Sequence, residues 1–224
     1  MGGMKEYMNK ITVGDMIELS KNIPDNSIDC IFTDPPYPKM YRFLYDELAI
    51  VAERVLKPMA PCFVYSGNDG VEYTIKAMTK TLKYRATIAF VNSGGGQIVW
   101  SSRFVAKYKP VFLFHKLAWH AKAPMALGAF NVKRDKVYHE WGQGIDEAFH
   151  YLRYHTKPGD IVFDPFCGGG TTAVAARMLG RRFITFEINE ESAGIAKSRL
   201  EESSDGIYQE QEALPTFDQL GLQF

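Results

Sequence analysis

A strand-like run that ends in a glycine cluster constrains the fold of this chain more than any other feature. Residues 160–170 read DIVFDPFCGGG, and Thr171 then opens a helical pattern. Glycines at such a turn let the backbone pass close to a ligand, and the free N–H groups of the helix start point toward it. The next strand-like run, 182–187, ends on Glu187, 19 residues after Gly168. Because dinucleotide folds bind ribose hydroxyls with an acid placed there, this half predicts a site for an adenosine-containing cofactor.

Strand-like runs alternate with helical patterns along the chain. Strands are expected at 10–13, 27–33, 61–65, 87–91, 111–115, 160–164 and 182–187, and helices at 43–56, 71–82, 145–155, 171–179 and 190–200. Pro58 and Gly180 stand where helices end. This alternation predicts an α/β fold with a mostly parallel sheet and helices on both faces.

A second motif follows an earlier strand-like run. Residues 30–37 read CIFTDPPY, so an apolar strand delivers Asp34, Pro35, Pro36 and Tyr37 at its carboxyl end, where open α/β sheets bind ligands. The exocyclic amino group of adenine or cytosine is a poor nucleophile because its lone pair is delocalised into the ring. Hydrogen bonds to the Asp34 carboxylate and the Pro35 carbonyl would localise that lone pair, while Tyr37 stacks on an extruded base. The alternative is a proline turn that only closes a strand.

Composition excludes several classes of protein. With 224 residues and 46% hydrophobic side chains, the chain has the mass for one compact domain, expected over residues 1–200 with an acidic tail at 201–224. No apolar run reaches the roughly 18 residues of a membrane span. The three cysteines form no CxxC pair, so neither a disulfide framework nor a zinc site is predicted. We expect a cytoplasmic, reduced protein with no metal.

The net charge of zero hides a strong asymmetry. Residues 76–140 contain twelve basic and two acidic side chains, whereas residues 201–224 contain six acidic side chains and no basic ones. A basic block interleaved with aromatic residues is typical of a surface that neutralises phosphates and stacks on bases. A solvated face is the alternative. The expected DNA contacts are Lys107, Lys109, Lys133, Arg134 and Lys136.

The two motifs resemble those of the DNA methyltransferases that modify amino groups with S-adenosylmethionine. TDPPY stands at 33–37 and DPFCGGGTT at 164–172, an order that resembles their beta class. Further matches extend the likeness over roughly residues 9–200: ITVGD, IPDNSID, ERVLKP, YKPVFLFHK and HEWGQ. The resemblance implies a Rossmann-like methyltransferase fold, circularly rearranged, with a mostly parallel seven-stranded sheet. Residues 116–140 correspond to a short target-recognition segment.

The resemblance also assigns roles to individual residues. Asp34, Pro35, Pro36 and Tyr37 would hold the target base. The cofactor pocket would be formed by three acids and by residues of the glycine motif. The acids are Asp15, Asp164 and Glu187, and the motif residues are Phe166, Gly168, Gly170 and Thr171. Trp141 and Gln143 depart from the commoner lysine-proline version of their segment.

Function and partners follow as expectations. The DPPY form favours transfer of a methyl group to adenine N6 in double-stranded DNA, with site-specific or relaxed recognition, as in restriction-modification or orphan phage enzymes. The alternatives are cytosine N4 methylation and a DNA-binding protein that keeps the fold without catalysis. Beta-class relatives suggest a homodimer, in a bacterial nucleoid or a phage-infected cell.

Two further sequence features each allow a functional and a structural interpretation. Pro61-Cys62 resembles the nucleophile dipeptide of enzymes that methylate cytosine carbon 5, but the rest of that motif is missing, so we predict that Cys62 is a core residue. The last six residues, Gln219–Phe224, resemble the peptide by which bacterial proteins dock on the replication sliding clamp. The alternative is a tail that packs on its own domain.

Overall fold

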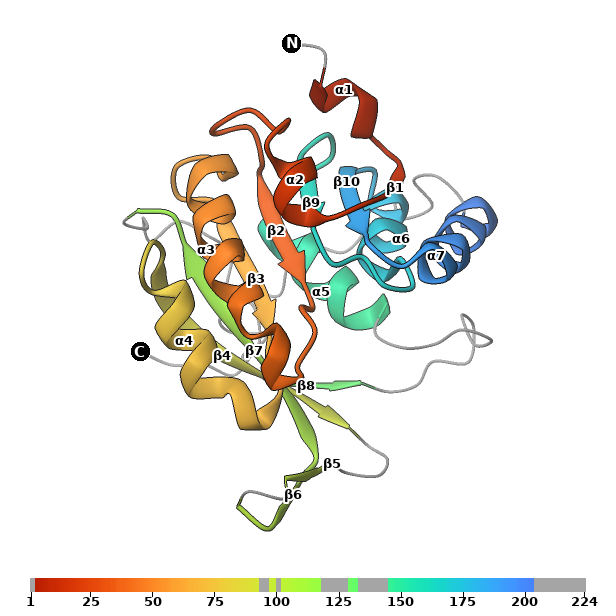
Figure 1. The fold of residues 1–224 in the computed structure, drawn as a ribbon. Coiled ribbons are helices and arrows are strands. Elements are labelled where there is room, and N and C mark those ends of the chain that lie inside the picture. Colours follow the sequence, from red (N-terminus) through yellow and green to blue (C-terminus); the bar gives the residue numbers. More distant parts are fainter. Residues whose placement is uncertain (1–2, 93–96, 100–101, 118–128, 133–144, 204–224) are drawn as a thin grey trace, which may run out of the picture.

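A sheet of eight strands forms the centre of the computed structural model, which describes residues 3–92, 97–99, 102–117, 129–132 and 145–203 (Figure 1). In spatial order the strands are β1 (Ile11–Val13), β10 (Arg182–Glu187), β9 (Ile161–Asp164), β2 (Cys30–Thr33), β3 (Pro61–Tyr65), β7 (Tyr108–His115), β4 (Lys83–Asn92) and β8 (Ala129–Val132). Strand β7 is antiparallel to both of its neighbours, and every other pairing is parallel. The predicted mostly parallel sheet is confirmed.

Helices cover both faces of this sheet, as predicted. One layer contains α2 (Met16–Ser20), α3 (Phe43–Val55) and α4 (Val71–Met78), and the other contains α5 (Ile145–His155), α6 (Thr171–Met178) and α7 (Glu190–Glu202). Side chains alternate along each strand, so Ile31 of β2 packs in the first core while Cys30 and Phe32 pack in the second. Burial on both faces explains why the strands are almost continuously apolar. Cys62 is fully buried, as predicted.

Several elements differ from the expected ones. The helix predicted for 71–82 ends at Met78, and the strand predicted for 87–91 begins at Lys83, where it pairs with His115 of β7. The short helix α1 (Gly3–Tyr7), helix α2, and the 3-10 turns η1 (Lys39–Tyr41) and η2 (Asn68–Gly70) were not predicted. Helices of one turn or so lack the periodic pattern that identifies longer ones.

The region between β4 and α5 holds more structure than the sequence predicts. A two-stranded hairpin of β5 (Gln97–Val99) and β6 (Phe104–Ala106) projects from the molecule at the end where β2 and β3 finish (Figure 1). Strand β8 lies within the expected inserted loop at 116–140 and pairs with β4, which adds an eighth strand to the seven expected. Its four residues form a strand because β4 offers them an open edge.

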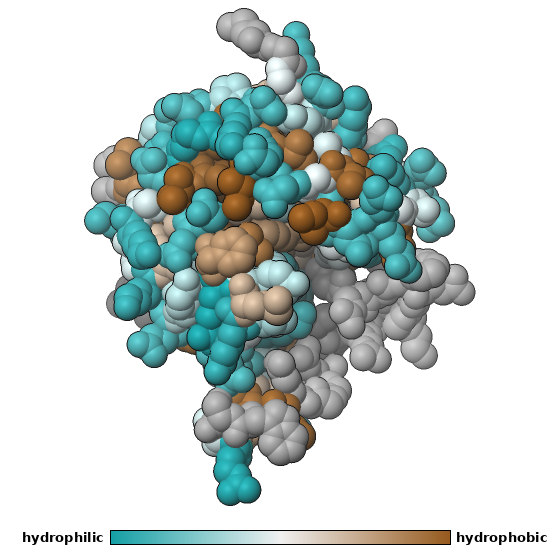
Figure 2. Space-filling view, in the orientation of Figure 1, coloured by the Kyte–Doolittle hydropathy of each residue, from teal (hydrophilic) through white to brown (hydrophobic). Residues whose placement is uncertain are grey.

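The surface is largely hydrophilic on the face shown in Figure 2, with apolar side chains in separate groups. This face is hollowed beside the carboxyl end of β2, where the glycine motif also opens. Within the described part of the chain, no helix has the length and apolar character needed to cross a bilayer.

Candidate active site

The two sequence motifs meet at the carboxyl edge of the sheet. Strand β2 lies beside β9, with Ile31 opposite Phe163, although the two strands are about 130 residues apart in sequence. Thr33 Oγ1 donates a 2.6 Å hydrogen bond to Asp164 Oδ1, which also accepts from the Phe166 N–H at 3.1 Å. Burial raises the pKa of Asp164 to about 6. Asp164 therefore joins the two motifs, a role that the sequence did not indicate.

The glycine motif is shaped by two glycines that act for different reasons. Gly170 has a φ of +82°, and a Cβ there would lie 2.9 Å from the Cβ of Ala196, so only glycine lets α7 approach the start of α6. Gly168 has a φ of +50°, but a Cβ there would meet no atom within 4 Å. Gly168 therefore faces open space, as a loop that cradles a ligand must.

Glu187 lies at the end of β10 with its carboxylate held by the backbone. Its Oε2 accepts a 2.7 Å hydrogen bond from the Gly168 N–H, and its Oε1 accepts a 2.8 Å bond from the Asn189 N–H. Two such bonds orient the carboxylate beside the glycine loop while leaving further lone pairs for a ligand. The next side chain, Ile188, is 70% exposed and provides an apolar surface at the same place.

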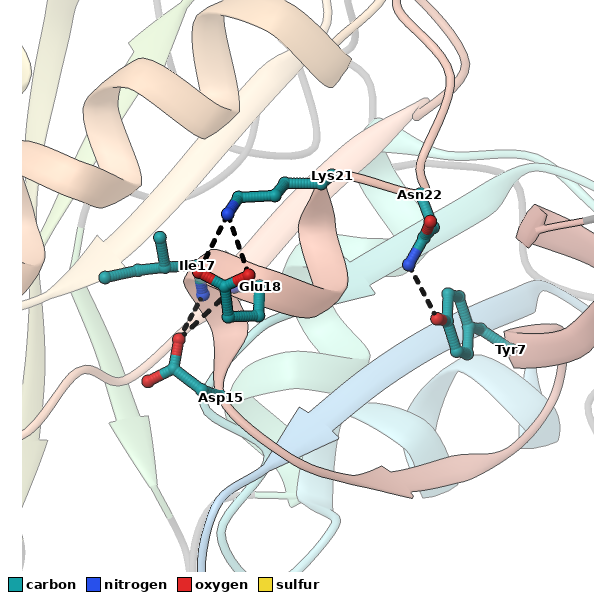
Figure 3. A network of polar contacts seen from close by, with 6 residues as sticks. All are labelled: Tyr7, Asp15, Ile17, Glu18, Lys21 and Asn22. Atoms are coloured by element: carbon teal, nitrogen blue, oxygen red, sulfur yellow. Dashed lines mark hydrogen bonds and ion pairs between the residues drawn. The ribbon is translucent and has the colours of Figure 1, made fainter.

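Asp15 follows β1, the strand that pairs with β10. Its Oδ1 accepts hydrogen bonds from the backbone N–H groups of Ile17 (2.8 Å) and Glu18 (3.3 Å), so it caps helix α2 (Figure 3). The Gly14 N–H donates to the Glu187 carbonyl at 2.9 Å, which keeps Asp15 near the end of β10. The cofactor contact of Asp15 stays a prediction, and its capping role is additional.

Arg199 of α7 braces the glycine motif from behind. Its Nη1 donates to the Gly169 carbonyl and lies 3.5 Å from Thr171 Oγ1. Thr171 is the first residue of α6. Phe166, also predicted to line the cofactor pocket, is partly buried against the core on the side of α2, α3 and α4. Sequence reasoning missed Arg199, because nothing in its spacing indicates that α7 folds back onto the loop.

The second motif forms the turn after β2. Pro35 is buried, whereas the Asp34 side chain reaches solvent from a recess whose protein walls desolvate it and raise its pKa. The Tyr37 hydroxyl is buried and makes no hydrogen bond of normal geometry within the described residues, although it lies near enough to the Asp34 carboxylate for that charge to raise its pKa further. A Cβ at Gly67 would lie 3.2 Å from Tyr37, so this glycine makes room for the aromatic ring.

Three side chains outside both motifs lie near Asp34, because Thr33 pairs with Val64 of β3 and Tyr65 pairs with Val111 of β7. The Tyr65 hydroxyl donates a short hydrogen bond to Glu147 Oε2, and Glu147 is only 8% exposed, so burial raises its pKa. The Nζ of Lys109 lies 5.7 Å from the centre of the Tyr65 ring, a cation–π contact. Lys109 also lowers the pKa of Asp34. The DNA contact that the sequence predicted for Lys109 stays a prediction, and its place beside the Tyr65 ring is additional.

The other predicted DNA contacts lie elsewhere. Lys107 is exposed between β6 and β7. Lys133, Arg134 and Lys136 lie outside the described residues, as do Trp141, Gln143 and the last six residues. In the described part of the chain, no group of three or more His, Cys, Asp or Glu side chains is placed to hold a metal ion.

Comparison with known proteins agrees with this geometry. Residues 148–198, which contain the glycine motif and Glu187, match the family model described as DNA methylase, for the N6 and N4 methyltransferases. The predicted resemblance to the amino-directed DNA methyltransferases is confirmed. The chain is 25% identical to the type II methyltransferase M.HinfI of Haemophilus influenzae, over 89% of this chain and 70% of the relative. It is 26% identical to the DNA adenine methyltransferase YhdJ of Escherichia coli K12, over 85% of this chain and 82% of the relative.

Solved structures of methylases share the fold. The complex of M1.HpyAVI with S-adenosylmethionine superposes with a TM-score of 0.68 at 23% identity, covering 85% of this chain and 98% of that one. The cytosine-N4-specific PvuII DNA methyltransferase superposes with a TM-score of 0.71 at 21% identity, covering 90% and 88%. The predicted methyltransferase fold is confirmed.

Proposed function

We propose that this chain transfers a methyl group from S-adenosylmethionine to an exocyclic amino group of a DNA base. The observation that carries the proposal is the adjacency of β2 and β9, which opens the Asp34–Tyr37 turn and the glycine loop at one edge of the sheet. The Thr33–Asp164 hydrogen bond keeps the two halves together. The family match and the methylase relatives support the same reaction.

The residues of the glycine loop fit an adenosine-containing cofactor. Gly168 faces open space, Glu187 presents an oriented carboxylate that can accept from ribose hydroxyls, and Ile188 provides an apolar surface for a flat ring. The N–H groups at the start of α6 can receive the carboxylate end of the cofactor. S-adenosylmethionine, when bound, supplies a methyl group on a positively charged sulfur.

The turn after β2 would act on the base. Asp34 and the Pro35 carbonyl accept hydrogen bonds from the amino group, which concentrates the nitrogen lone pair for attack. Tyr37, whose ring is packed over Gly67, stacks on the base. Asp34 or water then takes the proton that the methylated nitrogen loses. Catalysis by these residues is chiefly positioning and electrostatics, with no covalent bond between enzyme and base.

Adenine N6 is the proposed target. The DPPY form of the motif and the adenine-specific relative YhdJ favour it. Cytosine N4 is the second candidate because the cytosine-N4-specific PvuII enzyme superposes over 90% of this chain. Both bases present the same kind of amino group to Asp34, so the pocket around the rest of the ring decides between them.

Double-stranded DNA is the proposed partner, with the exposed Lys107 and the basic Lys133, Arg134 and Lys136 in contact with phosphates. If so, replacing these residues with alanine will weaken binding to all sequences and flatten its salt dependence. Target recognition by 116–140 and a single domain at 1–200 belong to the same proposal. Three predictions stay untested: a homodimer, a cytoplasmic location, and docking of Gln219–Phe224 on the replication sliding clamp. The docking can be tested by a pull-down with purified clamp, in which a chain truncated after Pro215 should no longer bind.

The test is methyl transfer from labelled S-adenosylmethionine to unmethylated DNA, followed by mass spectrometry of the nucleosides. N6-methyladenine that disappears in Asp34→Ala supports the proposal, and N4-methylcytosine selects the second candidate. Cofactor and DNA binding without any methylated base, across DNA of diverse sequence, would instead favour a binding protein that has kept the fold.

A further inference from the structure

Tyr65, Lys109 and Glu147 gather beside Asp34 although neither motif contains them. They come from three elements far apart in sequence: the end of β3, the start of β7 and the first turn of α5. The Tyr65 hydroxyl bonds to the Glu147 carboxylate, and the Lys109 ammonium lies over the Tyr65 ring. The three side chains thus form one connected unit, which we call the lysine–tyrosine–glutamate unit.

The tyrosine at the centre of this unit is held firmly. Its ring stacks on Phe90 with centroids 5.6 Å apart and meets the edge of Phe32 at 5.7 Å. Its carbonyl accepts a 3.2 Å hydrogen bond from the Tyr45 hydroxyl. A ring fixed from several sides is a rigid platform for the ammonium group that lies over it.

Packing alone does not explain the charges in this unit. A buried carboxylate costs free energy unless partners compensate it, and an apolar side chain at position 147 would fill the space without that cost. Charged groups retained in a partly desolvated recess are typical of functional sites. Lys109 lowers the pKa of both nearby carboxyl groups, Glu147 and Asp34.

Burial opposes the ionisation of Asp34, whereas the nearby Tyr37 hydroxyl and the charge of Lys109 both lower its pKa. Desolvation is the largest cause of its raised pKa. Within the described residues, the titratable groups that interact with Asp34 are Tyr37 of the same turn, Tyr45 of α3, Tyr65 of β3, Lys109 of β7, Glu147 of α5 and Asp164 of β9. Among these six groups Lys109 is the cation, so it is the one whose charge favours the carboxylate.

We propose that Lys109, held over Tyr65 and balanced by Glu147, is a positioning residue that keeps Asp34 ionised for methyl transfer. The carboxylate accepts a stronger hydrogen bond from the amino group than the protonated acid does, and it can later take the proton that the nitrogen loses. Tyr65 and Glu147 keep the ammonium group at this place, where a flexible lysine would otherwise turn toward solvent or a DNA phosphate. The inference rests on the proposed function, which requires an ionised Asp34, and it explains how that charge is maintained.

The first test compares Lys109→Met with Lys5→Met, an exposed lysine of α1 that lies outside the proposed site, and with Lys109→Arg, which keeps the charge. Methyl transfer is measured at saturating DNA and cofactor from pH 5.5 to 9. The loss of rate in Lys109→Met should be largest at the acid end of this range, about ten-fold, and should shrink as the pH rises, because a carboxyl group without its neighbouring cation ionises at higher pH. The profiles of Lys5→Met and Lys109→Arg should match that of the unchanged protein. A loss of equal size at every pH, or a rise in KM for DNA alone, would overturn the proposal.

A second measurement does not require activity. Carbon-13 NMR of protein labelled at the aspartate carboxyl groups follows the titration of Asp34, whose signal is identified by its loss in Asp34→Asn. Its midpoint should move to higher pH in Lys109→Met and stay in place in Lys5→Met. An unmoved midpoint in Lys109→Met refutes the proposal even if the protein methylates DNA. A moved midpoint in a protein that methylates nothing supports the electrostatic role while contradicting the proposed function.

Discussion

The glycine loop after β9 and the turn after β2 open at the same edge of the sheet, but they are built differently. The loop is shaped by one stretch of chain, from Ile161 to Arg199, and its ligand-facing groups are backbone amides and the Glu187 carboxylate that they orient. The turn depends on side chains from five other elements, and its key group, Asp34, is tuned by charge and desolvation. A binding loop can thus be local, whereas a reactive carboxylate needs an environment that only long-range packing assembles.

This difference predicts which property of the protein a substitution in each region will alter. Changes in the loop should alter cofactor affinity and folding stability, with little effect on pH dependence. Changes near the turn should alter the rate and its pH profile, with little effect on cofactor affinity. The four predictions below can break or sharpen this division, and they run from the largest expected effect to the smallest.

Asp34→Asn should lower methyl transfer by about 1,000-fold, because an amide neither accepts the proton nor carries the charge that localises the nitrogen lone pair. Cofactor affinity, measured by calorimetry, should stay within about two-fold, because the glycine loop does not use this side chain. If affinity fell as far as the rate, the two regions would not be separable.

Gly170→Ala should lower the free energy of unfolding by about 3 kcal/mol, from the left-handed backbone and the 2.9 Å approach to Ala196. The matched variant is Gly168→Ala, at which no neighbour lies within 4 Å. It should cost only about 1 kcal/mol for its backbone conformation and should weaken cofactor binding instead. Urea unfolding measures both. Equal losses of stability would mean that Gly168 is packed and not open.

Asp164→Asn should become more stable relative to the unchanged protein as the pH rises. The folded protein raises the pKa of Asp164 from 3.8 to about 6, so it binds the proton more tightly than the unfolded chain. Ionisation therefore destabilises the fold as pH rises from 4 to 6, and the penalty stays constant above that range. The asparagine lacks this penalty, so the difference in unfolding free energy between pH 4 and pH 8 should favour it by about 2 kcal/mol. A pH-independent difference would show that Asp164 is charged throughout.

Glu187→Gln should weaken cofactor binding about ten-fold, because hydrogen bonds to a charged acceptor are stronger than those to an amide. The control is Glu190→Gln, an exposed residue in the first turn of α7. Neither variant should shift the pH profile of methyl transfer. A shifted profile in Glu187→Gln would link the two regions electrostatically.

Local motifs were the most predictable part of this protein. The strand ending at Asp164, the glycine turn and the strand ending at Glu187 all lie where the sequence placed them, because each depends on neighbours within about 30 residues. Strand β8 and the β5–β6 hairpin were missed, because such short strands form only where a partner edge is present. The contact of Lys109 with the Tyr65 ring was missed because charge counts along a chain do not show which way a side chain points.

The sequence by itself determined the alternation of strands and helices, the two motifs and the family they resemble. These are properties of periodicity and of residue order, which need no knowledge of distant contacts. Only the tertiary structure decided that Thr33 bonds to Asp164, that Arg199 braces the loop and that Lys109, Tyr65 and Glu147 surround Asp34. The physical reason is that desolvation and Coulomb interactions depend on distances between residues far apart in sequence, and the strand order sets those distances.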